Sequence, residues 1–417
     1  MAITTRYLTG FEHGFIAAAA TAGEVLHKPG LVKAITLPAN WSASTTNPRN
    51  GSYCARLVAP ASTITNLRFE NWPIDPQTVI RFAVKVSSRP SSGSVMLAVG
   101  GANSIEGFRV GISSAGVLEC GFGTTVVTGP TIDTTNWHLI EFQHAASPKT
   151  VDWKVDGVLQ TRATARNTDS VEQFWLGTLS AAGQAFTADY DDLIIGNGWT
   201  DAASDWYGDG KVLGHRAGVD GTHATITSLS PGDAGTAYSG TPTNVNTMVD
   251  DPPGTLGWTA TRSATDNIAL RTATVGAYAE IKPAVTAETG QANGVIARIS
   301  WSASGTQANL AACDVRNSAG AVTEIYGLTG GVGQPYNVVA NQFQWNMVTP
   351  PAAGWTPAEV NAIRFRFGGC TSADINPVPT VQAMMLEVDW PISAAPPAAF
   401  PKRPTIARQA VNRAAVM

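Results

Sequence analysis

The chain is poor in charged residues. Only 14% of its 417 residues are Asp, Glu, Lys or Arg, against about 25% in an average soluble domain. Long surface helices need charged helix-forming residues on the face that meets solvent, so this shortage argues against a helical protein. Two explanations of the low charge stay open: a surface covered by neighbouring subunits, since interface cores are depleted of charge, or an ordinary low-charge secreted domain.

Basic residues are not in excess either. The chain has 27 Lys and Arg against 31 Asp and Glu, a net charge of −4 at neutral pH, so it lacks the positive surface that nucleic-acid binding requires. The charge is uneven, however, because residues 393–417 contain four basic side chains and no acidic one. We expect this basic end to dock on an acidic protein neighbour.

Cysteines and long apolar runs are scarce. Cys54, Cys120, Cys313 and Cys370 form no C-x-x-C pair, which argues against zinc and redox sites. Buried free thiols are the favoured interpretation, and a Cys54–Cys120 or Cys313–Cys370 disulfide stays open. The apolar run at 16–22 is too short for a membrane span, and the N-terminus has neither the basic nor the apolar region of a signal peptide. We therefore expect cytoplasmic synthesis without export and no membrane insertion.

What the sequence does contain is a succession of short β-prone segments. Gly and Ser clusters separate them at intervals typical of a sandwich or jelly roll, and Asp156-Gly157 is a hairpin signal. We therefore predict an all-β fold with two β-sandwich domains. The expected strands are 78–86, 94–99, 107–112, 117–122, 137–142, 151–155, 158–159 and 189–196 in the first half, and 277–282, 294–301, 308–315, 322–328, 363–367 and 380–388 in the second.

Changes of composition divide the chain. We predict a first sandwich at 1–200, an inter-domain connection at 201–223, a second sandwich at 224–392 and an arm at 393–417. Prolines in the arm exclude helix and central strand, so the arm should be extended, close to polyproline II; disorder is the alternative. Its assembly contacts are assigned to Phe400, Lys402, Arg403, Arg408 and Arg413.

One helical turn is expected inside the second domain. Thr356 is suited to cap it, Pro357 fits its first position, and Glu359 stands three residues after the cap, which is the capping-box arrangement. The helix 357–362 should lead directly into the strand 363–367.

Two parts of the first domain resemble concanavalin A-like (laminin-G-like) jelly rolls. Residues 137–142 (WHLIEF) and 151–157 (VDWKVDG) are similar to a W-H-x-hydrophobic and V-x-V-D-G hairpin of that family, and 190–197 (YDDLIIGN) is similar to its closing strand. The resemblance covers about residues 1–200. It implies that the closing strand pairs with the opening strand at 6–13, so that the ends of the domain meet.

A further segment, 349–363 (TPPAAGWTPAEVNAI), resembles a stretch near the end of tailed-phage structural proteins, with a shorter loop because Gly354 runs directly into Trp355. This resemblance implies a virion component, with a minor tail, tail-tip or fibre protein favoured over capsid decoration. A host-glycan-binding adhesin is the other alternative. The partners expected are other virion proteins, further copies of the chain (a trimer is one option) and host-surface carbohydrate.

Catalytic patterns are missing. Glycan hydrolysis needs two carboxylates about 5–10 Å apart, which on a strand would alternate as E-x-D-x-E to share a face, and the chain has no such pattern. Its histidines and glycine-rich segments match no metalloenzyme, serine hydrolase or nucleotide-binding motif. We therefore predict no catalytic residue and no enzyme.

Asp189 and Asp191 share one face of a predicted strand. With backbone carbonyls they could bind Ca²⁺, and the alternative is that these carboxylates cap turns or accept hydrogen bonds from backbone amides. No other cofactor is expected.

Twelve tryptophans are more than a chain of this size needs. Trp41, Trp72 and Trp206 fall in loop-like contexts, where an aromatic ring can stack on a sugar or anchor a partner. Trp153 and Trp175 lie in predicted strands, as does Trp301, and are expected in the core.

Overall fold

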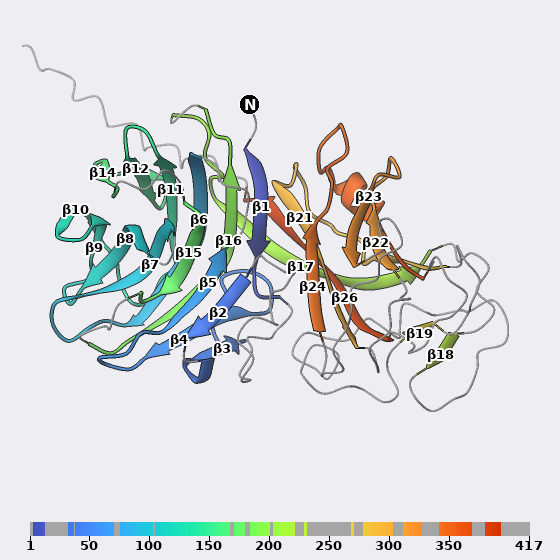
Figure 1. Ribbon diagram of the computed structural model, residues 1–417, viewed down its shortest axis with the longest axis horizontal. Helices are drawn as coiled ribbons and strands as arrows, with labels where there is room; N and C mark the ends of the chain where they lie inside the picture. The colour runs from blue at the N-terminus through green and yellow to red at the C-terminus, as the bar shows by residue number, and fades with distance from the viewer. Residues whose placement is uncertain are drawn as a thin grey trace, which may run out of the picture.

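The structure is a computed structural model of the chain. It describes residues 3–12, 32–36, 38–70, 76–102, 105–166, 171–179, 184–200, 203–221, 229–231, 268–270, 278–302, 312–326, 342–368 and 380–392. Across these ranges no helix is long and apolar enough to cross a membrane. Antiparallel strands dominate, and they form two bodies side by side (Figure 1). The all-β prediction is confirmed.

The first body is a sandwich of two antiparallel sheets. Within the described residues, one sheet runs in the order β13 (Val158–Leu159), β12 (Thr150–Val155), β11 (His138–Ala145), β6 (Gln77–Ser88), β16 (Phe186–Asn197), β4 (Cys54–Ala59) and β3 (Trp41–Ser44), with β1 (Thr4–Thr9) on β16 and β14 (Ala163–Thr164) on β12. The other runs in the order β10 (Thr125–Thr131), β9 (Val117–Phe122), β8 (Ile105–Ser113), β7 (Ser94–Ala102), β15 (Gln173–Gly177), β5 (Asn66–Glu70) and β2 (Val32–Thr36).

Side chains that alternate along facing strands fill the space between these two sheets. The ring of Phe82 on β6 lies 5.8 Å from that of Phe174 on β15. The hydroxyl of Tyr190 on β16 donates a hydrogen bond of 2.9 Å to the carbonyl of Leu97 on β7. Both contacts join one sheet to the other, so they fix how the sheets stack.

The opening strand of this body pairs with its closing strand. β1 runs antiparallel to β16, with Thr4 opposite Asn197 and Thr9 opposite Leu193. The two ends of the first body therefore meet, as the jelly-roll resemblance implied. This pairing also places β1 at the side that faces the second body.

The second body is one antiparallel sheet that folds onto itself. In the described part of the chain, β17 (Gly210–Asp220) pairs with β26 (Thr380–Pro391) through Arg216 and with β20 (Tyr278–Pro283) from Ala217 onward. On one side of it lie β26, β21 (Gly294–Ser302), β24 (Gln342–Met347), β19 (Ile268–Leu270) and β18 (Leu229–Pro231); on the other lie β20, β25 (Arg364–Gly368), β22 (Ala312–Arg316) and β23 (Val322–Tyr326). Buried Ile299, Phe365 and Leu386 belong to the core of this second sandwich.

The helical turn is confirmed as α1 (Pro357–Asn361). Thr356 has the extended backbone of an N-cap, and its hydroxyl accepts a hydrogen bond of 3.3 Å from the amide of Glu359. Val360 is buried in the second core. The turn is thus fixed both by its cap and by one apolar contact.

Strand β17 differs from the sequence interpretation, which placed 210–220 inside an inter-domain connection at 201–223. Asp209-Gly210 and Asp220-Gly221 mark the ends of this strand. Between them the strand forms a continuous ladder of pairs with β26, from Gly210 opposite Pro391 to Arg216 opposite Met385. The connection is therefore shorter than predicted at its C-terminal side.

The two bodies share buried residues. Val212 and Trp345 of the second body belong to the same apolar cluster as Tyr7 and Leu8 of β1. The Trp345 ring meets the Tyr7 ring edge-on, with centroids 4.9 Å apart. Because this contact is packed like a core, the two sandwiches form a continuous unit at the junction.

Candidate functional site

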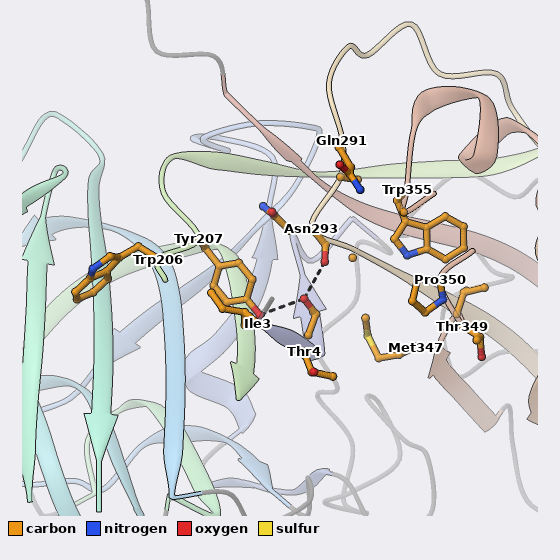
Figure 2. A pocket seen from close by; sticks show the side chains of 15 residues that line it. Ile3, Thr4, Trp206, Tyr207, Gln291, Asn293, Met347, Thr349, Pro350 and Trp355 are labelled. Atoms are coloured by element: carbon orange, nitrogen blue, oxygen red, sulfur yellow. Dashed lines mark hydrogen bonds between the residues drawn. The ribbon is translucent and has the colours of Figure 1, made fainter. Parts of the chain in front are cut away.

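A groove of about 700 Å³ opens where the two sandwiches meet (Figure 2). This volume lies within the range of about 300–1,000 Å³ that is usual for ligand pockets. Its walls come from β1, the segment before β17, the start of β21, the end of β24 and the loop before α1. We call it the junction groove. Its lining residues are Ile3, Thr4, Thr5, Trp206, Tyr207, Gln291, Ala292, Asn293, Gly294, Met347, Val348, Thr349, Pro350, Gly354 and Trp355.

Aromatic side chains stand at both ends of the junction groove (Figure 2). Trp206 is partly exposed, and the ammonium nitrogen of Lys154 lies 4.2 Å from the centre of its ring. Trp355 is only 4% exposed; its carbonyl accepts a 2.8 Å hydrogen bond from the amide of Ala292, which ties the loop to the strand. Trp206 therefore offers contact area to a ligand, while Trp355 mainly shapes the wall.

A chain of hydrogen bonds crosses the floor of the groove (Figure 2). The Thr5 hydroxyl donates to the carbonyl of Asn293 at 2.8 Å. It also lies 3.1 Å from the Tyr207 hydroxyl. Because the single hydrogen of Thr5 is used on Asn293, Tyr207 is the donor of the second bond. Burial raises the pKa of Tyr207, so this hydroxyl stays neutral and keeps its proton.

The loop before α1 approaches residue 291 closely. Gly354 has φ +73°, a backbone conformation that favours glycine. A Cβ at this position would lie 1.8 Å from the side-chain nitrogen of Gln291. Glycine therefore lets the loop carrying Trp355 pass beside the exposed amide of Gln291.

Buried ion pairs hold the walls from behind. The guanidinium of Arg81, on β6 of the first body, pairs with the carboxylate of Asp389, on β26 of the second, and both side chains are fully buried. Asp389 also accepts a 2.7 Å hydrogen bond from the side-chain amide of Asn293, a groove residue. Burial raises the pKa of Asp389, while the charge of Arg81 opposes that rise.

A second buried pair lies beside the first. Arg298 on β21 pairs with Glu387 on β26. Arg298 also donates a hydrogen bond of 3.0 Å to the carbonyl of Leu8. Glu387 accepts hydrogen bonds from the amides of Gly10 (3.2 Å) and Glu12 (3.0 Å), in the segment that follows β1. The carboxylate of one body is thus held by backbone donors of the other, which fixes their relative position.

The acidic residues proposed for calcium have separate partners. Asp189 pairs with Arg56 at 3.1 Å. Asp191 accepts a hydrogen bond of 2.9 Å from the backbone amide of Arg49, and neighbouring Asp192 accepts one of 2.6 Å from the amide of Val212. Among the described residues, no group of three or more His, Cys, Asp and Glu could hold a metal ion. Asp191 thus matches the alternative, in which the carboxylate accepts hydrogen bonds from backbone amides, whereas Asp189 has an arginine as its partner.

The tryptophan predictions have different outcomes. The prediction that Trp41 is a binding residue is wrong, because its side chain is buried and only 3% exposed. Trp41 begins β3 opposite Leu57, and its ring lies 5.7 Å from that of Tyr190 in the core. Trp206 does line the junction groove. Trp72 lies outside the described residues, as do the arm residues Phe400, Lys402, Arg403, Arg408 and Arg413.

Other predicted positions can be checked in the same way. Trp153 and Trp175 are buried, as expected. Cys54 and Cys120 are buried free thiols, so no disulfide joins them. Sequence reasoning missed Thr5 and Asn293 as groove residues, because neither belongs to a local pattern.

Comparison with known proteins gives only distant likenesses. No protein-family model matches the chain, and no curated protein sequence matches it significantly. A sialidase matches over 37% of this chain and 17% of its own, with 12% identity and a TM-score of 0.31; this chain thus spans less than a fifth of that protein. A cellulose-induced protein matches over 45% of this chain and 96% of its own, with 15% identity and a TM-score of 0.34. A carbohydrate esterase from the Shiga toxin-encoding bacteriophage phi24B matches over 38% and 87%, with 14% identity and a TM-score of 0.30.

These comparisons correct one prediction. The sequence was interpreted as that of a protein that is not an enzyme, but the similar structures include sialidases, an alginate lyase and a carbohydrate esterase. The prediction that the chain is not an enzyme is therefore not upheld. These likenesses have identities of 11–14% and TM-scores of 0.25–0.31, so they assign no activity to this chain.

Proposed function

We propose that this chain is an attachment protein of a tailed-phage particle, at the tail, tail tip or fibre, and that its junction groove binds a carbohydrate of the host surface. The observation that carries the proposal is the groove itself, in which a partly exposed tryptophan stands near amide and hydroxyl side chains. The segment 349–363, which resembles tailed-phage structural proteins, supplies one wall of this groove and the helix α1 behind it.

The lining suits a sugar for a physical reason. A pyranose ring presents C–H faces, which pack on an aromatic ring, and hydroxyl groups, which pair with amides and hydroxyls. Trp206 supplies the ring, Gln291 the exposed amide, and Thr4 an exposed hydroxyl. Because buried ion pairs join the two bodies behind these residues, the groove is formed before ligand arrives and little ordering entropy is lost on binding.

Blocking the groove tests the proposal. Thr4→Trp places a bulky ring in the groove from an exposed position on β1, and Thr125→Trp makes the same change at an exposed position on β10, a strand that contributes no lining residue. Binding of each purified variant to an array of oligosaccharides from the host envelope would be measured, with the melting temperature as a check on folding. We expect Thr4→Trp to weaken binding at least tenfold and Thr125→Trp to leave it unchanged. Equal binding by both variants, or no binding by the unaltered protein, would refute the glycan site.

The particle location has its own test. We expect this chain in purified phage particles, and labelling it with an antibody should mark the tail end in electron micrographs. Label spread evenly over the capsid would favour the alternative of a decoration protein.

A further inference from the structure

We infer that the junction groove selects neutral oligosaccharides and discriminates against anionic ones. This inference rests on the proposed glycan site and names the class of sugar that it takes. It starts from the polar groups of the lining, which are the amides of Gln291 and Asn293 and the hydroxyls of threonine and tyrosine. Among the described residues that line the groove, none is Asp, Glu, Lys, Arg or His.

Two of the charges next to the groove have partners of opposite charge, while Arg6, which follows the lining residue Thr5, donates a 2.8 Å hydrogen bond to the side-chain carbonyl of Asn197. Asp389, which holds the amide of Asn293, is paired with Arg81 and has no exposed surface. Lys211, close in sequence to Tyr207, is paired with Glu288 at 2.8 Å. The lining itself therefore presents neutral dipoles to a ligand, and the carboxylate of Asp389 lies behind the amide of Asn293.

Lys154 is a cation that lies directly against a lining residue. Its ammonium lies over the ring of Trp206, and burial lowers its pKa while the charge of Glu141 opposes that change. Recognition of carboxylated or phosphorylated sugars typically uses arginine forks or several cations that bind both oxygens of the anion. One lysine engaged with an indole ring and facing Glu141 does not supply such a site.

Neutral recognition has a consequence for salt. Interactions between exposed charges weaken as ionic strength rises, because the Debye length falls from about 10 Å at 0.1 M to about 3 Å at 1 M. Apolar contacts and neutral hydrogen bonds are not screened in this way. Binding in the groove should therefore keep its affinity when salt is raised.

The experiment compares two sets of oligosaccharides of equal length, one neutral and one carrying carboxylate, sulfate or phosphate groups. Each is titrated into the unaltered protein and into Thr4→Trp at 50 and 500 mM NaCl. We expect the neutral oligosaccharides to bind the unaltered protein and to bind Thr4→Trp more weakly. Their affinity for the unaltered protein should change less than twofold between the two salt concentrations. Anionic members should bind at least tenfold more weakly.

A gain-of-charge variant gives a second measurement. Gln291→Lys adds a cation at the exposed amide of the groove and should increase binding of anionic sugars at least fivefold at 50 mM NaCl, while Gln291→Glu should not. The inference is wrong if anionic sugars bind the unaltered protein tightly and this binding is abolished by Thr4→Trp and weakened by salt. That result would still support a glycan site in the groove. If no sugar of either set binds in a manner sensitive to Thr4→Trp, the proposed function itself fails.

Discussion

Arg81 offers a direct test of how the two sandwiches are joined. Its fully buried guanidinium pairs with Asp389 from the other body and donates 3.3 Å hydrogen bonds to the carbonyls of Gly208 and Asp192. Arg81→Met keeps an unbranched apolar stem but removes every one of these bonds. Of the partners of the Asp389 carboxylate in the described part of the chain, the amide of Asn293 is then the one that remains.

The expected magnitude follows from that burial. Removing one partner of a buried ion pair costs about 3–5 kcal/mol, because an uncompensated charge stays behind. Arg162 is the matched control: it also pairs with a carboxylate, that of Asp152, but its side chain is 56% exposed. An exposed pair contributes about 0–1 kcal/mol, so Arg162→Met should change stability by that amount at most.

The pH dependence has a definite sign. The pKa of Asp389 is already raised by burial, and loss of Arg81 would raise it further. An acid whose pKa is higher in the folded than in the unfolded state takes up a proton on folding, so its contribution to stability falls as pH rises. The deficit of Arg81→Met should therefore be larger at pH 8 than at pH 5.

Urea unfolding followed by tryptophan fluorescence measures the free energy of unfolding of the parent protein, of Arg81→Met and of Arg162→Met, at pH 5 and at pH 8. The double variant Arg81→Met/Asp389→Asn removes the stranded charge and should recover part of the loss. A loss below about 1 kcal/mol for Arg81→Met, similar to that of Arg162→Met, would refute the view that this pair holds the junction.

Three further predictions concern local features. Burial raises the pKa of Glu12 to about 8, so the parent protein should lose a few kcal/mol of stability as pH rises from about 4.5 to about 8. Glu12→Gln should flatten this dependence of stability on pH, as measured by urea titrations at pH 5, 7 and 9. An unchanged pH dependence in the variant would contradict the prediction. Thr356→Ala removes the cap of α1 and should cost about 1 kcal/mol, whereas Thr356→Ser should retain most of the stability in the same unfolding assay. Burial raises the pKa values of the thiols of Cys54 and Cys120. Brief treatment with iodoacetamide at pH 8, read out by peptide mapping, should therefore leave both thiols unlabelled in the native protein and label both in urea. Labelling of either thiol in the native protein would contradict their burial.

Much of the fold was predictable because its signals are local. The Asp156-Gly157 pair was expected to form a turn, and both residues have positive φ, +50° and +77°, between strands β12 and β13. The capping pattern around Thr356 predicted α1 for the same reason, since each donor and acceptor lies within four residues. Such features depend on near neighbours and hardly on the rest of the chain.

Errors arose where tertiary pairing decides the structure. Trp41 follows Pro38–Asn40, a short 3-10 turn, and this context resembled a loop, but pairing of β3 with β4 carries the ring into the core. Asp-Gly pairs at both ends of β17 are typical of turns, whereas the strand itself depends on pairing with β26, about 170 residues later in the chain. The junction groove could not be predicted because Thr5, Trp206 and Asn293 meet only in the folded molecule.

The contacts of Glu387 also set an order of events during synthesis. This carboxylate binds the hydroxyl of Thr9 and the amides of Gly10 and Glu12, partners separated from it by 375 to 378 residues of sequence. In a chain made from its N-terminus, the segment that follows β1 is therefore synthesised long before Glu387, its partner. Until β26 has been synthesised, the side of the first sandwich that packs against the second body is exposed, and Arg81 lacks its partner Asp389. Contacts between residues so far apart in sequence also form slowly. Translation that stops before β26 would leave this side exposed, so a truncated product should be recognised by chaperones and proteases, whereas a chain that includes β26 buries the same surface.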